Sequence, residues 1–306
     1  MMRGPLAERL VDAEYALAWR AVRALPPGAA HALFEWGAGW AVRRGGAGVR
    51  QLRANLARVR PDAAPAELDA LVRAGMRSYA RYWCEAFRLP AMDLADVHDR
   101  TAVSGTQPLY AALDEGRGAL VALPHSGNWD AAGVWLVETL RRRGHEPTFT
   151  TVGQRLRPDS LYRRFVAYRE GLGFEVVAAE DGSAAYRALV RRLRDGGVVC
   201  LLADRDVSGS GAEVTLFGAR TRLPVGPARL AALTGALLLP ARPWFPGDGW
   251  GIAFGPPVEA GRRGSAAATT QALADALAAL IADVPQDWHV LQPVWPATAR
   301  VEVDVT

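Results

Sequence analysis

The residues of this chain best suited to chemistry are a histidine and an aspartate five positions apart, in the segment GALVALPHSGNWD (118–130). The apolar run 119–123 predicts a buried strand, a proline stops it, and a glycine-containing turn leads to a helix. Two residues five apart on one helix point about 140° apart, so His125 must lie in the turn and Asp130 in the first helical turn. A histidine beside a carboxylate that fixes its tautomer is equipped to take a proton from a hydroxyl. We therefore expect His125 to be a general base held by Asp130. The alternative is a turn histidine and an aspartate that only cap the helix.

Further segments resemble the glycerolipid and lipid A type acyltransferases, in which H-x-x-x-x-D or H-x-x-x-x-E is the catalytic motif. These segments are RPDSLYRRFVAYRE (157–170), VVCLLADRDVSG (198–209), LFGARTRLPVGPARLAALTGALLLP (216–240) and PQDWHVLQPVW (285–295). The helical opening, with VRQLRANLARV (49–59) and RSYARYWCEAFRLP (77–90), is most similar to the actinobacterial phosphatidylinositol mannoside acyltransferases. The resemblance covers nearly the whole chain, and the set is much more specific than any single motif.

This resemblance implies an acyl-CoA-dependent O-acyltransferase that moves a long fatty acyl chain to a mannose hydroxyl of a phosphatidylinositol mannoside-type glycolipid. Acyl-CoA is then a co-substrate, no cofactor is needed, and the acceptor oxygen attacks the thioester without a covalent acyl-enzyme. The near alternative is the same chemistry with acyl carrier protein as donor, or with a lipid A-like or lysophospholipid acceptor. The distant alternative is a non-catalytic lipid-binding protein, against which the intact His125 and Asp130 argue.

A second carboxylate, Asp204, follows a clearly buried strand in LLADRD. Relatives carry an acidic residue here, often Glu, and the resemblance implies a relay between this carboxylate and the histidine. Because Asp is one methylene shorter, the sequence leaves open whether Asp204 contacts His125. The alternative is an aspartate that caps the next turn.

Arg163, Arg164 and Arg169 share one predicted helix, and Arg169 falls where the family places an active-site arginine. Arginine binds phosphate with two parallel hydrogen bonds, so this helix could contact the inositol phosphate or the pantetheine diphosphate. We interpret Arg163 as a solvated surface residue. For Arg164, both phosphate binding and a solvated surface position stay open. Gln154 stands where relatives often have Glu and is expected at the substrate site.

Two later segments add substrate-binding candidates through the resemblance. His289 matches a family histidine near the acceptor sugar; without the resemblance it is a core or surface histidine beside Trp288. Phe217 and Gly218 match the family's acyl-side loop. Glycine there permits a close backbone approach and could supply N–H donors to an oxyanion, although a strand turn needs glycine anyway.

The elements that must position these residues change in kind near residue 100. Before it, apolar residues recur at three- and four-residue spacing and predict helices, one ending at Pro26 and Pro27, others over 33–42, 55–59 and 68–87. After it, strands alternate with helices, which predicts an α/β fold with a mixed central sheet flanked by helices. The expected strands are 119–123, 147–152, 173–178, 197–203, 213–217, 237–243 and 250–255, and the expected helices are 129–142, 159–171, 183–195, 224–235 and 268–283.

This change predicts an N-terminal helical membrane-docking region over 1–98 and one integrated acyltransferase core over 99–306. Sites in α/β folds collect beyond the carboxyl ends of strands, where His125 and Asp204 both fall.

Composition excludes several kinds of chemistry. All 36 basic residues are arginine, so Schiff-base, pyridoxal phosphate and phosphate-loop lysine chemistry are ruled out. GxGxxG is absent, and no serine hydrolase elbow is present. Cys84 and Cys200 lie in apolar sequence without ligand spacing, so we expect core residues in a reducing compartment and no metal site.

Charge and aromatic residues favour a membrane surface over nucleic acid. The net charge is +4 and the pI near 9.4, and Trp19, Trp36 and Trp40 are accompanied by arginines, as in interfacial anchors. No charge-free apolar run reaches the roughly 18 to 20 residues that span a bilayer. The N-terminus also lacks the pattern of a signal peptide. We therefore expect a peripheral protein on an anionic membrane, at the cytoplasmic face of the plasma membrane.

Overall fold

A mixed sheet of seven strands, ordered β1-β9-β8-β2-β5-β3-β4, forms the centre of the part of the chain described by the computed structural model, residues 19–155, 159–206, 209–260 and 265–296. Neighbouring strands are parallel except for the antiparallel pair β8 and β9. A separate antiparallel hairpin, β6 and β7, stands beside it. The bounds are β1 (Thr101–Ser104), β2 (Ala119–Leu123), β3 (Phe149–Gly153), β4 (Phe174–Ala178), β5 (Val198–Leu202), β6 (Ala212–Leu216), β7 (Ala219–Leu223), β8 (Leu237–Trp244) and β9 (Trp250–Phe254).

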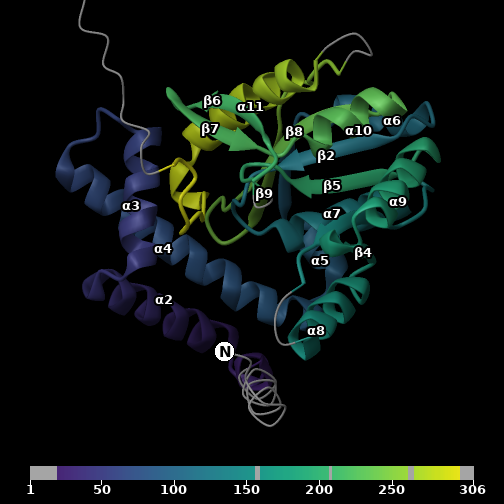
Figure 1. Cartoon of the computed structure of the whole chain (residues 1–306). Coiled ribbons are helices and arrows are strands. Elements are labelled where there is room, and N and C mark those ends of the chain that lie inside the picture. The colour runs from purple at the N-terminus through teal and green to yellow at the C-terminus, as the bar shows by residue number, and fades with distance from the viewer. Residues whose placement is uncertain (1–18, 156–158, 207–208, 261–264, 297–306) are drawn as a thin grey trace, which may run out of the picture.

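Helices cover both faces of this sheet (Figure 1). α5 (Leu94–Asp99), α6 (Gln107–Asp114) and α7 (Trp129–Arg142) share an apolar cluster with one face. The opposite face packs against α9 (Ser183–Arg194), α10 (Gly226–Thr234) and α11 (Ala266–Asp283). Every residue of β2 is buried because the strand is covered on both sides, as its continuous apolar sequence predicts.

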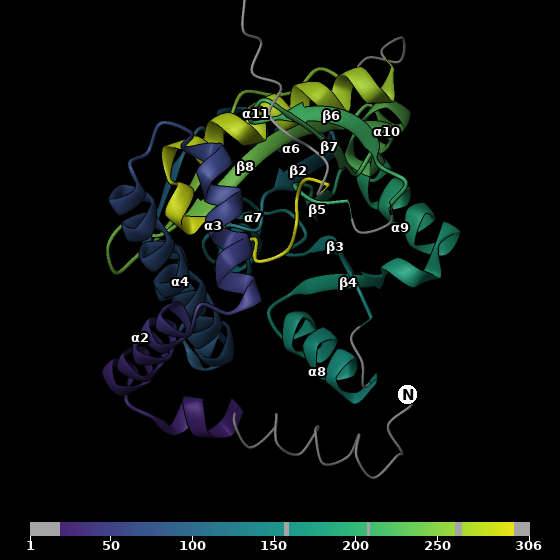
Figure 2. The same cartoon turned by 60° about the vertical axis from the view of Figure 1, so that its left-hand side comes forward.

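The N-terminal part is helical, as predicted. α2 (Pro27–Arg44), α3 (Ala47–Val59) and α4 (Pro65–Arg88) lie together at one side of the sheet, and α8 (Asp159–Glu170) lies across from α4 (Figure 2). α4 reaches the core through the short helix η3 (Pro285–Asp287). None of the helices in the described residues is both long and apolar enough to span a membrane.

The predicted α/β fold with a mixed sheet is confirmed, and β2 and α7 have the predicted bounds. Among the described strands and α-helices, β1, β7, α5 and α6 were not predicted. β7 alternates arginines with buried residues and depends on its hairpin partner for strand structure. The first predicted helix, which ends at Pro26 and Pro27, is described only from Trp19 onward, where it is helical.

This topology brings the site residues together. β2, β5 and β3 are adjacent and parallel, so their carboxyl ends share one edge of the sheet. His125 follows β2, Asp204 follows β5, and Gln154 follows β3.

Candidate active site

The turn that carries His125 is fixed from both sides. Gly127 has φ 53°, and a Cβ there would lie 2.6 Å from the carbonyl carbon of Pro243, so only glycine fits. Its N–H donates to the Asp287 carbonyl at 2.9 Å, and the His289 N–H donates to the His125 carbonyl at 2.8 Å. Asn128 then caps α7, its Oδ1 accepting the Ala131 N–H at 2.9 Å. His125 is therefore held at the sheet edge by its own backbone.

Asp204 is the carboxylate that holds the histidine ring. Its Oδ1 lies 2.6 Å from His125 Nδ1, and its Oδ2 accepts the His125 backbone N–H at 2.9 Å and the Trp288 indole N–H at 2.8 Å. The side chain is only 1% exposed. Burial alone would raise the pKa of Asp204, but the charge of His125 and these hydrogen bonds outweigh it, and the pKa lies below 3.8. Asp204 therefore stays ionised, and the shorter side chain does reach His125.

Asp130 has a different partner from the one that the sequence predicts. Its Oδ1 accepts the Arg169 Nε–H at 3.0 Å, and its Oδ2 accepts the Tyr82 hydroxyl at 3.3 Å. Burial lowers the pKa of Arg169, but the charge of Asp130 outweighs it and raises that pKa above its ordinary value. Asp130 is the second residue of α7 and faces α4 and α8 there, whereas Asp204 approaches the ring from the neighbouring strand. The prediction that Asp130 holds the imidazole is corrected: Asp204 does.

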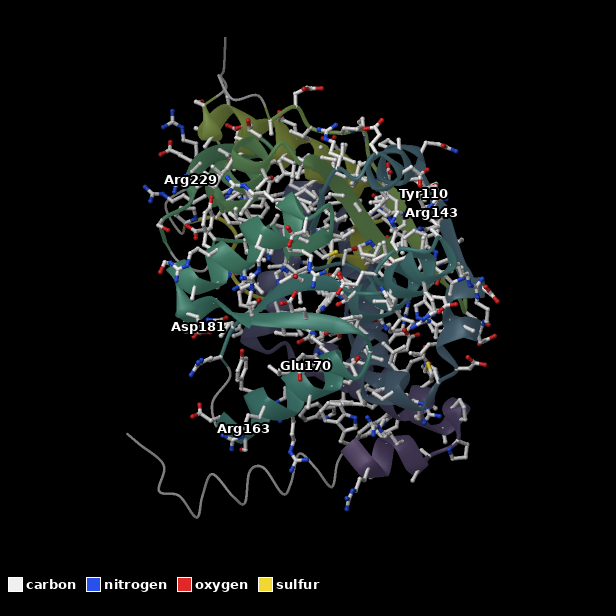
Figure 3. The ribbon with its side chains drawn as sticks, turned by 90° about the vertical axis from the view of Figure 1, so that its right-hand side faces the viewer. Tyr110, Arg143, Arg163, Glu170, Asp181 and Arg229 are labelled. Carbon is white, nitrogen blue, oxygen red and sulfur yellow. The ribbon has the colours of Figure 1, made fainter. Side chains whose placement is uncertain are left out.

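The same ion pair changes the interpretation of Arg169. The arginine side chain is 15% exposed, and its Nε–H is bonded to Asp130 inside the protein. The neighbouring arginines are exposed on α8, and neither lines a pocket with His125. Figure 3 shows Arg163 on the side of α8 that faces away from β4, consistent with the prediction of a surface position. Arg164 is also exposed, and it is not among the residues that line the pocket with His125.

A pocket with mainly apolar lining, called the polar pocket here after the polar side chains in its wall, opens beside His125. We use this name for the cavity whose wall includes His125, His289, Arg205 and Gln154, with aromatic rings of α4 and α8 around them. The predicted residues Gln154 and His289 therefore do share a pocket with His125. Arg205 is half-buried and donates to Gln292 Oε1 at 2.7 Å.

His289 is held by a hydrogen-bonded chain that sequence reasoning missed. Its Nε2 lies 2.8 Å from Ser78 Oγ, which donates to Asp287 Oδ1 at 2.5 Å. Burial, followed by the charge of His125, lowers the pKa of His289 to about 3, so the ring is neutral. The Ser78 hydroxyl donates its proton to Asp287, so the Ser78 oxygen must accept the proton of His289 Nε2. His289 Nδ1 then carries no proton and can only accept a hydrogen bond. The nitrogen Nδ1 is buried and makes no hydrogen bond with the described residues.

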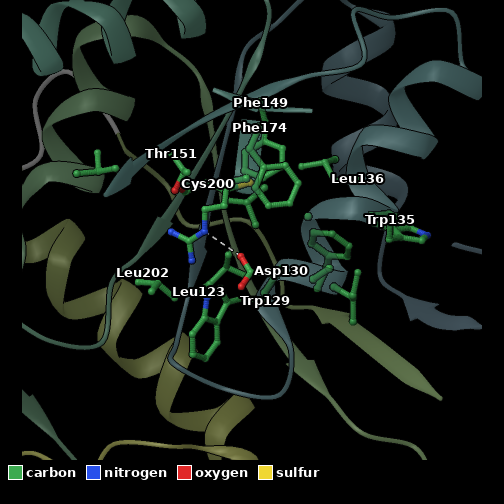
Figure 4. A pocket seen from close by; sticks show the side chains of 18 residues that line it. Leu123, Trp129, Asp130, Trp135, Leu136, Phe149, Thr151, Phe174, Cys200 and Leu202 are labelled. Carbon is green, nitrogen blue, oxygen red and sulfur yellow. Dashed lines mark hydrogen bonds and ion pairs between the residues drawn. The ribbon is translucent and has the colours of Figure 1, made fainter. Parts of the chain in front are cut away.

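An apolar pocket lies behind the site. We use this name for the cavity between α7 and the sheet, lined by side chains such as Leu136, Phe149, Phe174 and Cys200. In Figure 4 the Trp129 ring lies on one side of the Asp130 ion pair, and the Phe149 and Phe174 rings lie on the other. Burial raises the pKa of the Cys200 thiol, so it remains protonated and acts as an apolar wall residue.

The predicted acyl-side loop lies outside both pockets. Phe217 and Gly218 form the β6–β7 turn with positive φ values of 49° and 71°. Phe217 packs against Trp288 at a centroid distance of 6.2 Å and against Trp295 at 6.4 Å. Neither turn residue lines the polar or the apolar pocket. The loop therefore supports Trp288, which in turn supports Asp204. Within the described residues no three His, Cys, Asp or Glu side chains are grouped as metal ligands would be.

Comparisons with known proteins show which family the chain belongs to. A sequence model of the bacterial lipid A biosynthesis acyltransferases matches residues 8–296. The chain belongs to this acyltransferase family. It is 52% identical, over 96% of its length and 94% of the relative, to the phosphatidylinositol mannoside acyltransferase of Mycolicibacterium smegmatis. It is 50% identical, over 96% of its length and 92% of the relative, to the phosphatidylinositol mannoside acyltransferase of Mycobacterium tuberculosis H37Rv.

Proposed function

We propose that this acyltransferase moves a long-chain fatty acyl group from acyl-CoA to a mannose hydroxyl of a phosphatidylinositol mannoside-type glycolipid, with His125 as general base. The observation that carries the proposal is the position of His125, which lies on the polar pocket next to the apolar pocket and is held by an ionised Asp204. The names of the mycobacterial relatives support the choice of acceptor.

The hydrogen bonding of His125 fixes which nitrogen acts. Nδ1 donates its proton to Asp204, so Nε2 keeps its lone pair and accepts the proton of the acceptor hydroxyl. The acceptor oxygen forms a bond to the thioester carbonyl carbon, and the carbon–sulfur bond then breaks. The imidazolium passes its proton to the leaving thiolate, which departs as free CoA thiol. Asp204 stabilises the imidazolium between these two steps.

The two pockets suit the two kinds of substrate. The acyl chain would enter the apolar pocket, whose walls include leucine and phenylalanine side chains and protonated Cys200, and which must widen from its volume of about 60 Å³ to hold a long chain. The sugar would lie in the polar pocket, where the neutral ring of His289 forms part of the wall. Arg205 lies on the same pocket and is suited to a substrate phosphate, whereas Arg169 already serves Asp130.

Helix α2 offers a surface for membrane docking. Leu33, Trp36 and Trp40 are three and four residues apart and 50%, 65% and 49% exposed, so they form one apolar stripe. The Arg44 guanidinium lies 5.2 Å from the Trp40 ring centre. Exposed tryptophan beside arginine is typical of helices that lie in an anionic membrane interface. We propose peripheral binding at the cytoplasmic face of the plasma membrane through this stripe.

The proposed activity is tested by incubating the purified protein with palmitoyl-CoA and mono- or dimannosylated phosphatidylinositol. Product mass and free thiol are followed together, and the result expected is one added palmitoyl group for each thiol released. Parallel reactions contain palmitoyl-acyl carrier protein, a lipid A precursor or a lysophospholipid. Faster transfer in one of these would replace the proposed substrate pair. Binding of the lipids without any transfer would favour a non-catalytic lipid-binding protein.

A further inference from the structure

One tryptophan separates the two pockets. Trp129, the first residue of α7, lines both the polar and the apolar pocket, as do Arg169 and Leu202. Its ring packs on Tyr82 with a centroid distance of 3.9 Å and meets the His125 ring nearly edge-on at 5.8 Å. Figure 4 shows the indole next to Asp130 at this boundary. The ring therefore stands between the base and the cavity proposed for the acyl chain.

The indole N–H at this boundary has no acceptor. Trp129 Nε1 is buried and makes no hydrogen bond with the described residues. An indole nitrogen can only donate, and a buried donor left unpaired costs about 1–3 kcal/mol. Two other buried indole N–H groups of the described residues are paired: Trp288 donates to Asp204 at 2.8 Å and Trp250 to Glu85 at 2.7 Å. The unpaired donor is thus a property of position 129.

The proposed reaction brings an acceptor to this place. With the acyl chain in the apolar pocket and the attacking hydroxyl on His125, the thioester carbonyl lies at the wall that Trp129 forms. The carbonyl oxygen gains negative charge as the new carbon–oxygen bond forms, and a preorganised donor stabilises that charge.

On the basis of the proposed function, we propose that the indole N–H of Trp129 donates a hydrogen bond to the acyl carbonyl oxygen and stabilises the oxyanion of the transition state. Nε1 is covered by its neighbours, so the ring turns as the acyl chain enters and exposes its donor to the carbonyl. Because the indole N–H is unpaired in the free protein, the ring position in which it bonds to the substrate carbonyl is favoured once the acyl chain is bound. Arg169, which is ion-paired to Asp130 at the same wall, adds positive charge but does not replace this donor.

Two phenylalanine variants separate this role from a structural one. Trp129→Phe keeps a flat ring against Tyr82 but loses the N–H. Trp250→Phe is the matched control, because it also loses a buried indole N–H, but one that is paired with Glu85 and lies outside both pockets. Loss of one oxyanion donor lowers kcat roughly 10²–10³-fold. We expect that loss in Trp129→Phe with little change in KM, and wild-type kcat with lower thermal stability in Trp250→Phe.

A spectroscopic measurement reports the hydrogen bond itself. Palmitoyl-CoA labelled with ¹³C at the carbonyl is bound to each protein without acceptor, and the carbonyl stretch is recorded by difference infrared spectroscopy. The stretch should move to lower wavenumber on binding to the wild type and to Trp250→Phe, but not on binding to Trp129→Phe. The thioether S-hexadecyl-CoA has no carbonyl, so it should bind equally to all three proteins and thereby report an intact pocket.

The outcomes separate this inference from the proposed function. A Trp129→Phe protein with wild-type kcat and a shifted carbonyl stretch overturns the role of Trp129 while leaving the acyltransferase proposal intact. A wild type that binds no palmitoyl-CoA overturns both. If Trp129→Phe fails to bind the thioether, benzothienylalanine placed at position 129 decides by the same two measurements. This residue has the shape of tryptophan with sulfur in place of the N–H.

Discussion

Replacing Asp204 with asparagine should reverse the tautomer of His125. The Oδ2 position of Asp204 accepts two donors, the His125 backbone N–H and the Trp288 indole N–H, and Oδ1 faces His125 Nδ1 alone. The asparagine oxygen therefore takes the position with two donors, because the opposite orientation leaves both unpaired at about 1–3 kcal/mol each. Its NH₂ group then faces Nδ1, and the ring proton must move to Nε2.

An imidazole with its proton on Nε2 cannot accept the proton of the substrate hydroxyl. The same exchange in Ser-His-Asp enzymes imposes the wrong tautomer and lowers kcat about 10⁴-fold, which corresponds to about 5.4 kcal/mol of activation free energy. We expect a fall of roughly 10³–10⁴-fold in kcat for Asp204→Asn with a folded protein. Asp195→Asn, on the exposed end of α9, serves as the control and should keep wild-type turnover.

Two measurements check the prediction. Steady-state kinetics give kcat, and ¹H–¹⁵N spectra of the five histidines report which nitrogen carries the proton. His125 should be protonated on Nδ1 in the wild type and on Nε2 in the variant. A variant that loses less than about tenfold in kcat, or one that is inactive with Nδ1 still protonated, would refute the tautomer argument.

Three further results are expected. Asp130→Asn and Arg169→Met each leave a buried charge unpaired and should lower the free energy of unfolding by about 3–5 kcal/mol. In urea unfolding, the double variant should lose less free energy than the sum of the two single losses. Additive losses would argue against the ion pair. The pKa of His289 lies at about 3, below the value of 6.5 for a free histidine, so the unfolded chain binds the extra proton between these pH values and stability falls with falling pH by up to about 1.4 kcal/mol per unit. His289→Gln should remove this slope, and an unchanged slope would assign it to another group. Trp36→Ser should weaken flotation with anionic vesicles at low salt while Tyr186→Ser, an exposed aromatic change on α9, should not; equal loss in both would remove α2 as the docking surface.

Local sequence predicts much of the fold and the position of the base. The apolar run of β2, the asparagine cap of α7 and the turn between them are all adjacent in sequence, which is why the place of His125 could be predicted. Asp204 could be placed at the same sheet edge because it follows a second buried strand. Helix α6 is only eight residues long, so its three buried positions, Leu109, Ala112 and Leu113, are too few to stand out as a helical pattern in the sequence.

The assignment of partners could not be predicted, because it depends on packing between distant segments. Asp130 faces Arg169 only because α8 packs opposite the start of α7, 39 residues later in the chain. Ser78 and Asp287 meet across 209 residues, and no local pattern links them to His289. The unpaired indole of Trp129 is likewise visible only once its surroundings are known.

The account depends most on His125 as the base of a direct acyl transfer. The decisive measurement is the turnover of His125→Ala with palmitoyl-CoA and mannosylated phosphatidylinositol, with the fold checked by thermal unfolding. The account predicts a fall of roughly 10²–10⁴-fold in kcat with a native unfolding transition, since a turn residue contributes little packing. A folded His125→Ala protein with near-wild-type turnover would contradict it.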